Sequence, residues 1–180
     1  KYEPIKWRVL NKDNNDVFLL SDIALDDQRY NEKWATITWE KSSMRSWING
    51  YKASENQSEI DYSNKNFIDT AFSTAQKNAI KTTKVENRNN IHYGSAGQGG
   101  NDTSDKIFLL SEREVYNTDD AKKYGFVLDG EVYDEARRCK CSTYAYAMGT
   151  WRNIEDSEYN GNALWFLRSP GGSCYGDVTA

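Results

Sequence analysis

The sequence has no long apolar run and no excess of positive charge, and each absence excludes a class of function. No stretch approaches the roughly 18 apolar residues of a membrane-spanning helix, so we expect no direct membrane insertion. The formal net charge is −4 and the pI is about 5.1. Nucleic-acid binding requires clustered Lys and Arg, so nucleic acid is not an expected partner. There is also no signal-peptide pattern, and we expect a mature or excised domain.

Histidine is nearly absent, which argues against the common catalytic arrangements. His92 is the single histidine, and it lies in an Asn- and Gly-rich loop. A Ser–His–Asp or Cys–His arrangement would have to use it, and no nucleophile-elbow pattern is present. Residues 101–105 offer oxygen ligands without the spacing of a calcium-binding loop. We therefore predict no catalytic residue, no metal and no cofactor.

Cysteine is also scarce, and its three positions do not make a disulfide framework. Cys139 and Cys141 are too close for a relaxed bridge to each other, and an odd number cannot pair completely. A bridge from Cys174 to one of them stays open, and free thiols are the simpler expectation. With His92 they would give four nominal zinc ligands, but the spacing lacks the paired pattern of structural zinc sites.

Aromatic residues are what the chain has in quantity. They make up 13% of the sequence, with six Trp and twelve Tyr. A chain of 180 residues suits a single domain, residues 1–180, that would bury roughly 70% of the surface of its unfolded chain. We expect a folded domain whose interior or surface is rich in aromatic rings.

Two main helices are predicted from apolar spacing and from caps. Apolar residues at i, i+3 and i+4 predict a helix over about 43–49 that ends at Gly50. A second helix, over about 74–81, begins at the capping box that Ser73 and Gln76 can form.

The strands are predicted from apolar alternation and from short apolar runs. Alternation over 5–9 and the run 17–20 indicate an N-terminal hairpin, and the run 107–110 indicates a further strand. The run 164–168 is four large apolar residues followed by arginine and then by turn residues, which is typical of a strand buried on both faces. We interpret it as the central strand. Strands and helices do not alternate, so the predicted fold is α+β, with one twisted, mostly antiparallel sheet and long irregular loops.

A buried arginine needs a carboxylate or access to solvent, and this predicts a structural ion pair. Arg168 ends the predicted central strand, where its charge cannot be lost. Glu40 directly follows Trp39 and precedes Arg45 by five positions. We predict that Glu40 is an internal partner of Arg45 or of Arg168.

Seven runs occur in order along almost the whole chain. They are P-I-K-W-R-V-L at 4–10, F-L-L-S at 18–21, T-W-E-K-S-S-M-R-S-W-I-N at 38–49, T-A-F-S at 70–73, D-K-I-F-L-L-S at 105–111, T-Y-A-Y-A at 143–147 and W-F-L-R-S-P-G at 165–171. Together they resemble a bacterial family of domains of unknown function, common in secreted and cell-surface multidomain proteins of anaerobic gut bacteria. The resemblance implies a C-type-lectin-like fold, related to that of formylglycine-generating enzymes, and a location outside the cell or at its surface. Family members usually continue with further strands, so we expect the C-terminal strands to be lacking or truncated.

The function that these features favour is a non-catalytic extracellular module that binds carbohydrate or protein. Trp and Tyr supply flat contact area at low entropic cost, and long loops on a rigid scaffold suit recognition. The candidate ligand-binding residues flank the predicted central strand. They are Trp151, Arg152, Asn153, Ser173, Tyr175 and Asp177.

Two alternatives remain open. One is a structural spacer domain in a surface protein. The other is an oxidase of the formylglycine-generating type, which the resemblance suggests; such enzymes act through a copper-binding cysteine pair, and here Cys174 would have to lie beside Cys139 or Cys141. The oligomeric state is left open.

Overall fold

The computed structural model describes residues 4–90, 93–94, 97–117, 119–126, 135–155 and 157–171. They fall into two compact units, each made of separate stretches of the chain. Unit 1 takes the described residues within 4–27 and 113–165, and unit 2 takes those within 28–112 and 166–171. The prediction of one domain over 1–180 with missing C-terminal strands stays a prediction.

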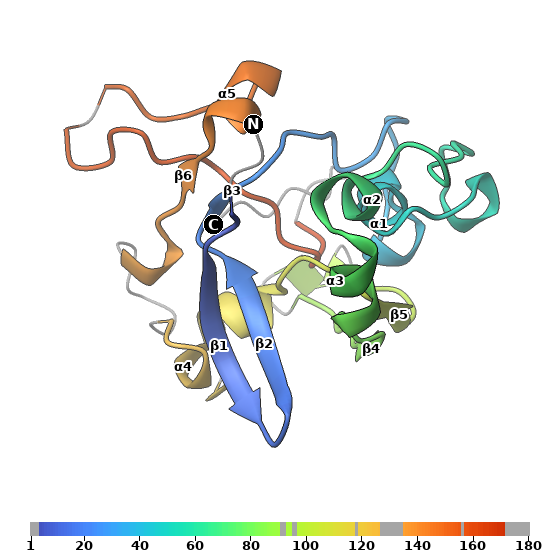
Figure 1. Ribbon diagram of the computed structural model, residues 1–180, viewed down its shortest axis with the longest axis horizontal. Coiled ribbons are helices and arrows are strands. Elements are labelled where there is room, and N and C mark those ends of the chain that lie inside the picture. Colours follow the sequence, from blue (N-terminus) through green and yellow to red (C-terminus); the bar gives the residue numbers. More distant parts are fainter. Residues whose placement is uncertain are drawn as a thin grey trace. The chain divides into compact units, whose positions relative to one another are not determined.

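Unit 1 is built on an N-terminal hairpin, as the sequence predicts (Figure 1). Asn14 turns the chain with a φ of 48°, a left-handed conformation that asparagine tolerates. Val9 pairs with Leu19 and Asn11 with Phe18, so Leu10 is left as a buried bulge. The elements of unit 1 are β1 (Trp7–Asp13), β2 (Asp16–Ser21), β3 (Ile23–Ala24), η4 (Arg113–Asn117), α4 (Asp119–Lys123), η5 (Glu135–Arg137), β6 (Lys140–Cys141) and α5 (Thr143–Met148).

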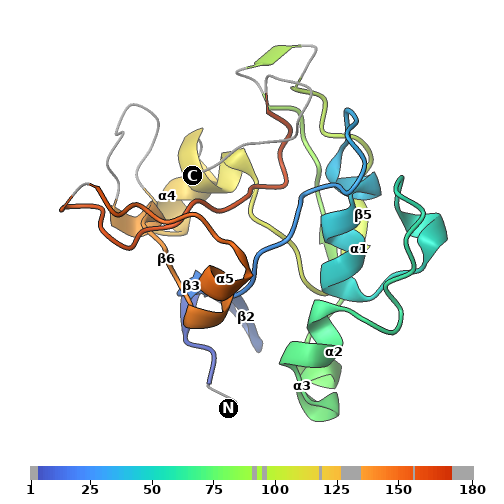
Figure 2. The same cartoon turned by 90° about the horizontal axis from the view of Figure 1, so that it is seen from above.

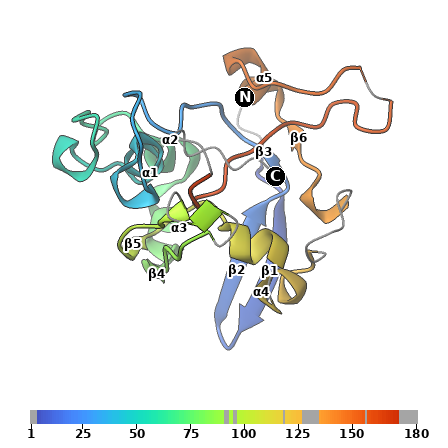
Figure 3. The same ribbon diagram turned by 180° about the vertical axis from the view of Figure 1, so that it is seen from behind.

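Aromatic packing and a short parallel pair connect the later elements of unit 1 to its N-terminal part. The rings of Phe18 and Tyr124 meet edge to face with centroids 5.4 Å apart, so the residue after α4 packs on β2 (Figure 3). β3 pairs with β6 in parallel, and α5 begins directly after β6. The Ser142 hydroxyl accepts the Ala145 N–H at 2.9 Å and caps α5.

Unit 2 contains both predicted main helices. α1 has the predicted bounds 43–49; the Ser42 hydroxyl caps it at 3.1 Å, and Gly50 ends it with a φ of 73°. α3 begins at the predicted capping box and ends at Ala79, two positions before the predicted end. Figure 2 shows α1, α2 and α3 in succession. The elements of unit 2 are η1 (Trp39–Lys41), α1 (Ser43–Asn49), η2 (Ala53–Glu55), α2 (Phe67–Ala71), α3 (Thr74–Ala79), β4 (Thr83–Val85) and β5 (Thr103–Asp105).

The core of unit 2 surrounds Trp39, whose side chain is fully buried. Tyr30, Met44 and Ile48 pack with it in one cluster. Phe166 packs against this cluster, with its ring centroid 5.7 Å from that of Tyr30. The C-terminal apolar run therefore does contribute to the core, although not as a sheet strand.

The prediction of one sheet with 164–168 as its central strand is wrong. The strands of the described residues form three two-stranded sheets, β1–β2, β3–β6 and β4–β5, and the second of these is parallel. Residues 164–168 belong to none of them and pass from unit 1 to unit 2 after Trp165. Leu164 is half-exposed, while Leu167 and Arg168 are buried. An apolar run specifies burial, but it does not specify a ladder partner. The α+β class is confirmed, and among the described residues no helix has the length and apolarity to cross a bilayer.

Candidate recognition surface

Two runs that carry the resemblance, 38–49 and 105–111, meet at one buried carboxylate in unit 2. Asp105 at the end of β5 is fully buried. Trp39 Nε1 donates to its Oδ2 at 3.0 Å, and Arg45 Nε donates to its Oδ1 at 2.8 Å. The Thr103 hydroxyl donates to Oδ2 at 2.7 Å and the Tyr51 hydroxyl donates to Oδ1 at 3.1 Å. We call these five residues the Asp105 network.

The Asp105 network is closed to a ligand. Four side-chain donors occupy the two carboxylate oxygens. The Arg45 guanidinium also lies over the Tyr51 ring, 4.8 Å from its centroid. Burial and then the Asp105 charge raise the pKa of Tyr51 to about 12, so the phenol stays protonated at neutral pH. The network therefore stabilises the fold and offers no group for acid–base catalysis.

The Asn49 side chain bonds the main chain where the predicted strand 107–110 would begin, and the structure has no strand there. Its Oδ1 accepts the N–H groups of Lys106 at 3.2 Å and of Ile107 at 3.0 Å. Its Nδ2 donates to the Ile107 carbonyl at 2.8 Å. A side-chain amide at the end of α1 thus satisfies the main chain where a neighbouring strand would otherwise be needed. Ile107, Phe108 and Leu109 instead pack against the core of unit 2.

The acidic partner of Arg45 is Asp105, not Glu40. Glu40 contacts Arg45 through its main-chain carbonyl, which accepts from Nη1 at 3.0 Å, and its carboxylate accepts from Asn101 at 3.0 Å. Asp105 lies 60 positions from Arg45 in the sequence, so local spacing could not reveal the pair.

Arg168 is buried in unit 2 as the sequence predicts, and main-chain carbonyls surround its guanidinium. Nη1 donates to the Leu109 carbonyl at 2.7 Å, and Nη2 donates to the Glu86 carbonyl at 3.2 Å. Its charge centre lies 5.7 Å from the Phe108 ring. Contact with Glu40 is not among these interactions, so the predicted Glu40–Arg168 pairing stays a prediction.

In unit 1 large side chains on α5 and on the segment after it are exposed or, for Arg152, partly buried, and we call this group the α5 surface. Trp151 is 57% exposed and Ile154 is 68% exposed. Figure 1 shows α5 in orange, followed by the extended chain that carries the later members. The members are Tyr144, Tyr146, Met148, Trp151, Arg152 and Ile154.

The main chain holds this surface in place. Arg152 forms an antiparallel bridge with Ala163, and Asn153 N donates to the Asn162 carbonyl at 2.8 Å. Gly161 N donates back to the Asn153 carbonyl at 2.7 Å. The Arg152 guanidinium lies over the Tyr146 ring, 3.7 Å from its centroid. This stack joins α5 to the following segment and fixes one cation against one exposed ring.

Three of the six predicted ligand-binding residues lie in this region. Trp151 is exposed, Arg152 is partly buried on Tyr146, and the Asn153 side chain accepts the Glu155 N–H at 3.0 Å. Ser173, Tyr175 and Asp177 lie outside the described residues. Sequence reasoning missed Tyr144 and Tyr146; alternation of tyrosine with alanine in a short helix is the signal that could have found them.

Two of the three cysteines, Cys139 and Cys141, lie among the described residues. Cys139 and Cys141 are free thiols, and burial raises the pKa of Cys139, which disfavours the reactive thiolate. Cys174 lies outside the described residues, so its predicted approach to them stays a prediction. Within the part of the chain that the structure describes, no three His, Cys, Asp or Glu residues gather as metal ligands would.

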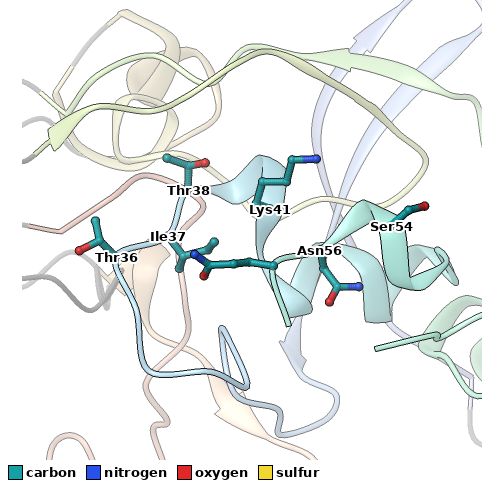
Figure 4. Close-up of a pocket in the computed structure, with 7 residues that line it drawn as sticks. Thr36, Ile37, Thr38, Lys41, Ser54 and Asn56 are labelled. Atoms are coloured by element: carbon teal, nitrogen blue, oxygen red, sulfur yellow. The ribbon is translucent and has the colours of Figure 1, made fainter. Parts of the chain in front are cut away.

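Unit 2 also has an open pocket of about 440 Å³, shown in Figure 4. Thr36, Ile37 and Thr38 precede η1 on one side, and Ser54 and Asn56 lie opposite. The Asn56 amide donates to the Ile60 carbonyl at 2.9 Å and accepts its N–H at 3.2 Å, so it is engaged in shaping a loop. Lys41 is the one charged residue that lines the pocket among the described residues, and it is exposed.

These features define the class: a small α+β protein with a closed buried carboxylate network and an exposed aromatic surface. The chain belongs to the family described as a domain of unknown function (DUF6273), whose model matches residues 14–180. The match covers every described element from β2 onward, including the Asp105 network and the α5 surface. No curated protein and no solved structure matches the chain.

Proposed function

We propose that this domain is a non-catalytic binding module that recognises carbohydrate or protein through the α5 surface. The observation that carries the proposal is the concentration of half-exposed rings there. Tyr144, Tyr146 and Trp151 are each between 48% and 57% exposed within eight positions of one another. Clustered exposed apolar side chains mark interaction sites on soluble domains.

The energetics suit recognition. Covering apolar surface yields about 25 cal/mol per Å², and rigid aromatic side chains lose little entropy when a ligand covers them. Trp, Tyr and Arg are also the residue types that dominate binding energy at interfaces. All three types occur on the α5 surface, on a main chain already fixed by the bridge between Arg152 and Ala163.

The hydrogen bonds and the pKa values of several described ionisable groups support the non-catalytic part of the proposal. Asp105, Arg45 and Tyr51 satisfy one another inside unit 2. The Cys139 thiol has a raised pKa. Groups in these states are poorly suited to accept or deliver a proton to a substrate.

The finer parts of the proposal are a C-type-lectin-like relationship and a location outside the cell or at its surface, in a bacterium. The ordered sequence runs, the N-terminal hairpin and the long irregular connections of both units support the fold relationship. The location follows from the resemblance alone.

Binding can be tested with a glycan array and with pull-down from bacterial and host surface material. We expect a signal that Trp151→Ala reduces at least about tenfold, since buried aromatic anchors are worth 2 kcal/mol or more. Trp34→Ala is the matched control, because Trp34 is an 82% exposed tryptophan in unit 2 and its loss should leave binding unchanged. Blank results from both assays would contradict the proposal and favour a spacer role.

A further inference from the structure

Four arginines of the described residues stack on tyrosines. Arg137 lies 4.4 Å from the centre of the Tyr116 ring, and the other three pairs differ in whether a carboxylate neutralises the arginine. Arg45 lies over Tyr51 and pairs with Asp105 at 2.8 Å. Arg138 lies 4.7 Å from the centre of the Tyr159 ring and pairs with Glu158 at 2.8 Å. Two of the stacked guanidinium groups are thus neutralised by a carboxylate of the same unit.

Arg152 has the closest stack and no such carboxylate. Its charge centre is 3.7 Å from the centre of the Tyr146 ring. Among the described residues no Asp or Glu lies within ion-pair distance of it. A guanidinium that no carboxylate of the protein neutralises still has N–H donors for an acceptor supplied from outside.

The chemistry of stacking defines what that acceptor is. A ring covers the flat face of a guanidinium and leaves the in-plane N–H groups free. Those groups match the two oxygens of a carboxylate, and a charge-assisted bidentate pair is among the strongest polar contacts. Stacking on the Tyr146 ring fixes the orientation of the Arg152 guanidinium, so the side chain has little rotamer entropy left to lose when a ligand binds.

We infer that Arg152, stacked on Tyr146, is the anchor for a carboxylate of the ligand, and that the ligand is an oligosaccharide carrying an acidic sugar. This inference rests on the proposed function and names its ligand class. Arg152 binds the sugar carboxylate, and the exposed faces of the neighbouring rings receive the apolar faces of adjoining sugar rings.

Two observations favour an acidic oligosaccharide over an acidic peptide. Extended peptides bind by adding to free main-chain edges, whereas the main chain of Asn153 is already bonded to Asn162 and Gly161. The exposed side chains are also individual rings on a short helix and the segment after it, which suits flat, repeating sugar units.

The test is calorimetric titration of the full chain with an oligosaccharide bearing one glucuronic acid, and with the same oligosaccharide after its carboxylate is reduced to an alcohol. The acid form should bind roughly 10- to 100-fold more tightly, which is the range for a hydrogen-bonded charged group. Arg152→Met should abolish this preference while weak binding of the reduced form persists. Arg152→Lys should retain part of the preference for the acid form, because the positive charge remains but the planar pair of N–H donors is lost.

Arg138→Met is the matched control, since it removes a stacked arginine of the same unit that already has its carboxylate. It should leave the preference intact, and thermal melting checks that each variant is folded. Equal affinity for the acid and reduced forms would overturn this inference while leaving the proposed function standing. Binding of an Asp- and Glu-rich peptide in place of either sugar would overturn the choice of ligand class. Absence of binding to any glycan or protein probe would overturn both.

Discussion

Each of the two units contains an arginine stacked on a tyrosine, and the Arg45–Tyr51 stack of unit 2 differs from the Arg152–Tyr146 stack of unit 1 in whether a carboxylate completes it. In unit 2 the Arg45–Tyr51 stack is completed by Asp105, which accepts two further hydrogen bonds and is fully buried. In unit 1 the Arg152–Tyr146 stack has no carboxylate partner among the described residues and lies among exposed rings. An arginine neutralised by a buried carboxylate stabilises the fold. We infer that an arginine without a carboxylate partner, on a surface of exposed rings, is available to a ligand.

Removing the Asp105 carboxylate, the partner of Arg45, should have the largest effect on stability. Asp105→Ala leaves the buried Arg45 charge without its counter-ion, and breaking a buried pair from one side costs about 3–5 kcal/mol. We expect a fall of that size in the free energy of unfolding, measured by urea denaturation. Asp105→Asn, which keeps an acceptor oxygen, should lose less. A loss below about 1 kcal/mol for the alanine variant would contradict the structural role of the network.

Shortening the central tryptophan should cost less. Trp39→Phe deletes the Nε1–H that donates to Asp105 and leaves a small cavity beside Met44. One lost hydrogen bond to a charged group and the cavity together suggest about 2–4 kcal/mol. Chemical denaturation measures this loss, and Trp34→Phe serves as the control because Trp34 is exposed. Equal effects of the two substitutions would show that Trp39 is not central to the core.

The phenol of Tyr51 gives the network a specific dependence on pH. Because its folded-state pKa, about 12, exceeds the ordinary value of 10.0, folding favours the protonated phenol. Its contribution is complete below pH 10 and is lost as the pH rises from 10 to 12. After allowance for partial exposure we expect about 1 kcal/mol. The difference in unfolding free energy between the wild type and Tyr51→Phe should therefore shift against the wild type over this interval, and a constant difference would contradict it.

The smallest effect on stability is expected at Arg152, which has no carboxylate partner among the described residues. Arg152→Met keeps the apolar stem on Tyr146 and removes a charge that no described carboxylate neutralises. The unfolding free energy should change by no more than about 0.5 kcal/mol, as for other surface substitutions. Arg45→Met should lower the free energy of unfolding by several kcal/mol, since it leaves the buried Asp105 carboxylate without its counter-ion. Similar losses at both positions would remove the distinction between the two stacks.

Local signals in the sequence predicted the elements that depend on neighbouring residues. The bounds of α1 follow from apolar spacing and from Gly50, and the start of α3 follows from Ser73 and Gln76. The prediction of Trp151 and Arg152 as ligand-binding residues rested on their place beside the run 164–168. Trp151 is exposed and Arg152 is partly buried.

Relations between distant residues could not be obtained in this way. The choice of Asp105 over Glu40 as the partner of Arg45 joins two residues that are 60 positions apart in the sequence. The Asn49 side chain, 58 positions away, satisfies the main chain at Ile107, where a strand was expected to begin. In the run 164–168, Leu167 and Arg168 are buried in unit 2, and no pattern within the run shows that it joins none of the sheets of the described residues.

The most direct test of the account is the ratio of affinities for the glucuronic-acid oligosaccharide and its reduced form, measured for the wild type and for Arg152→Met. The account predicts a ratio of about ten or more in the wild type and a ratio near one in the variant, with equal melting temperatures. A wild-type ratio near one, or a ratio that survives the loss of Arg152, would contradict it.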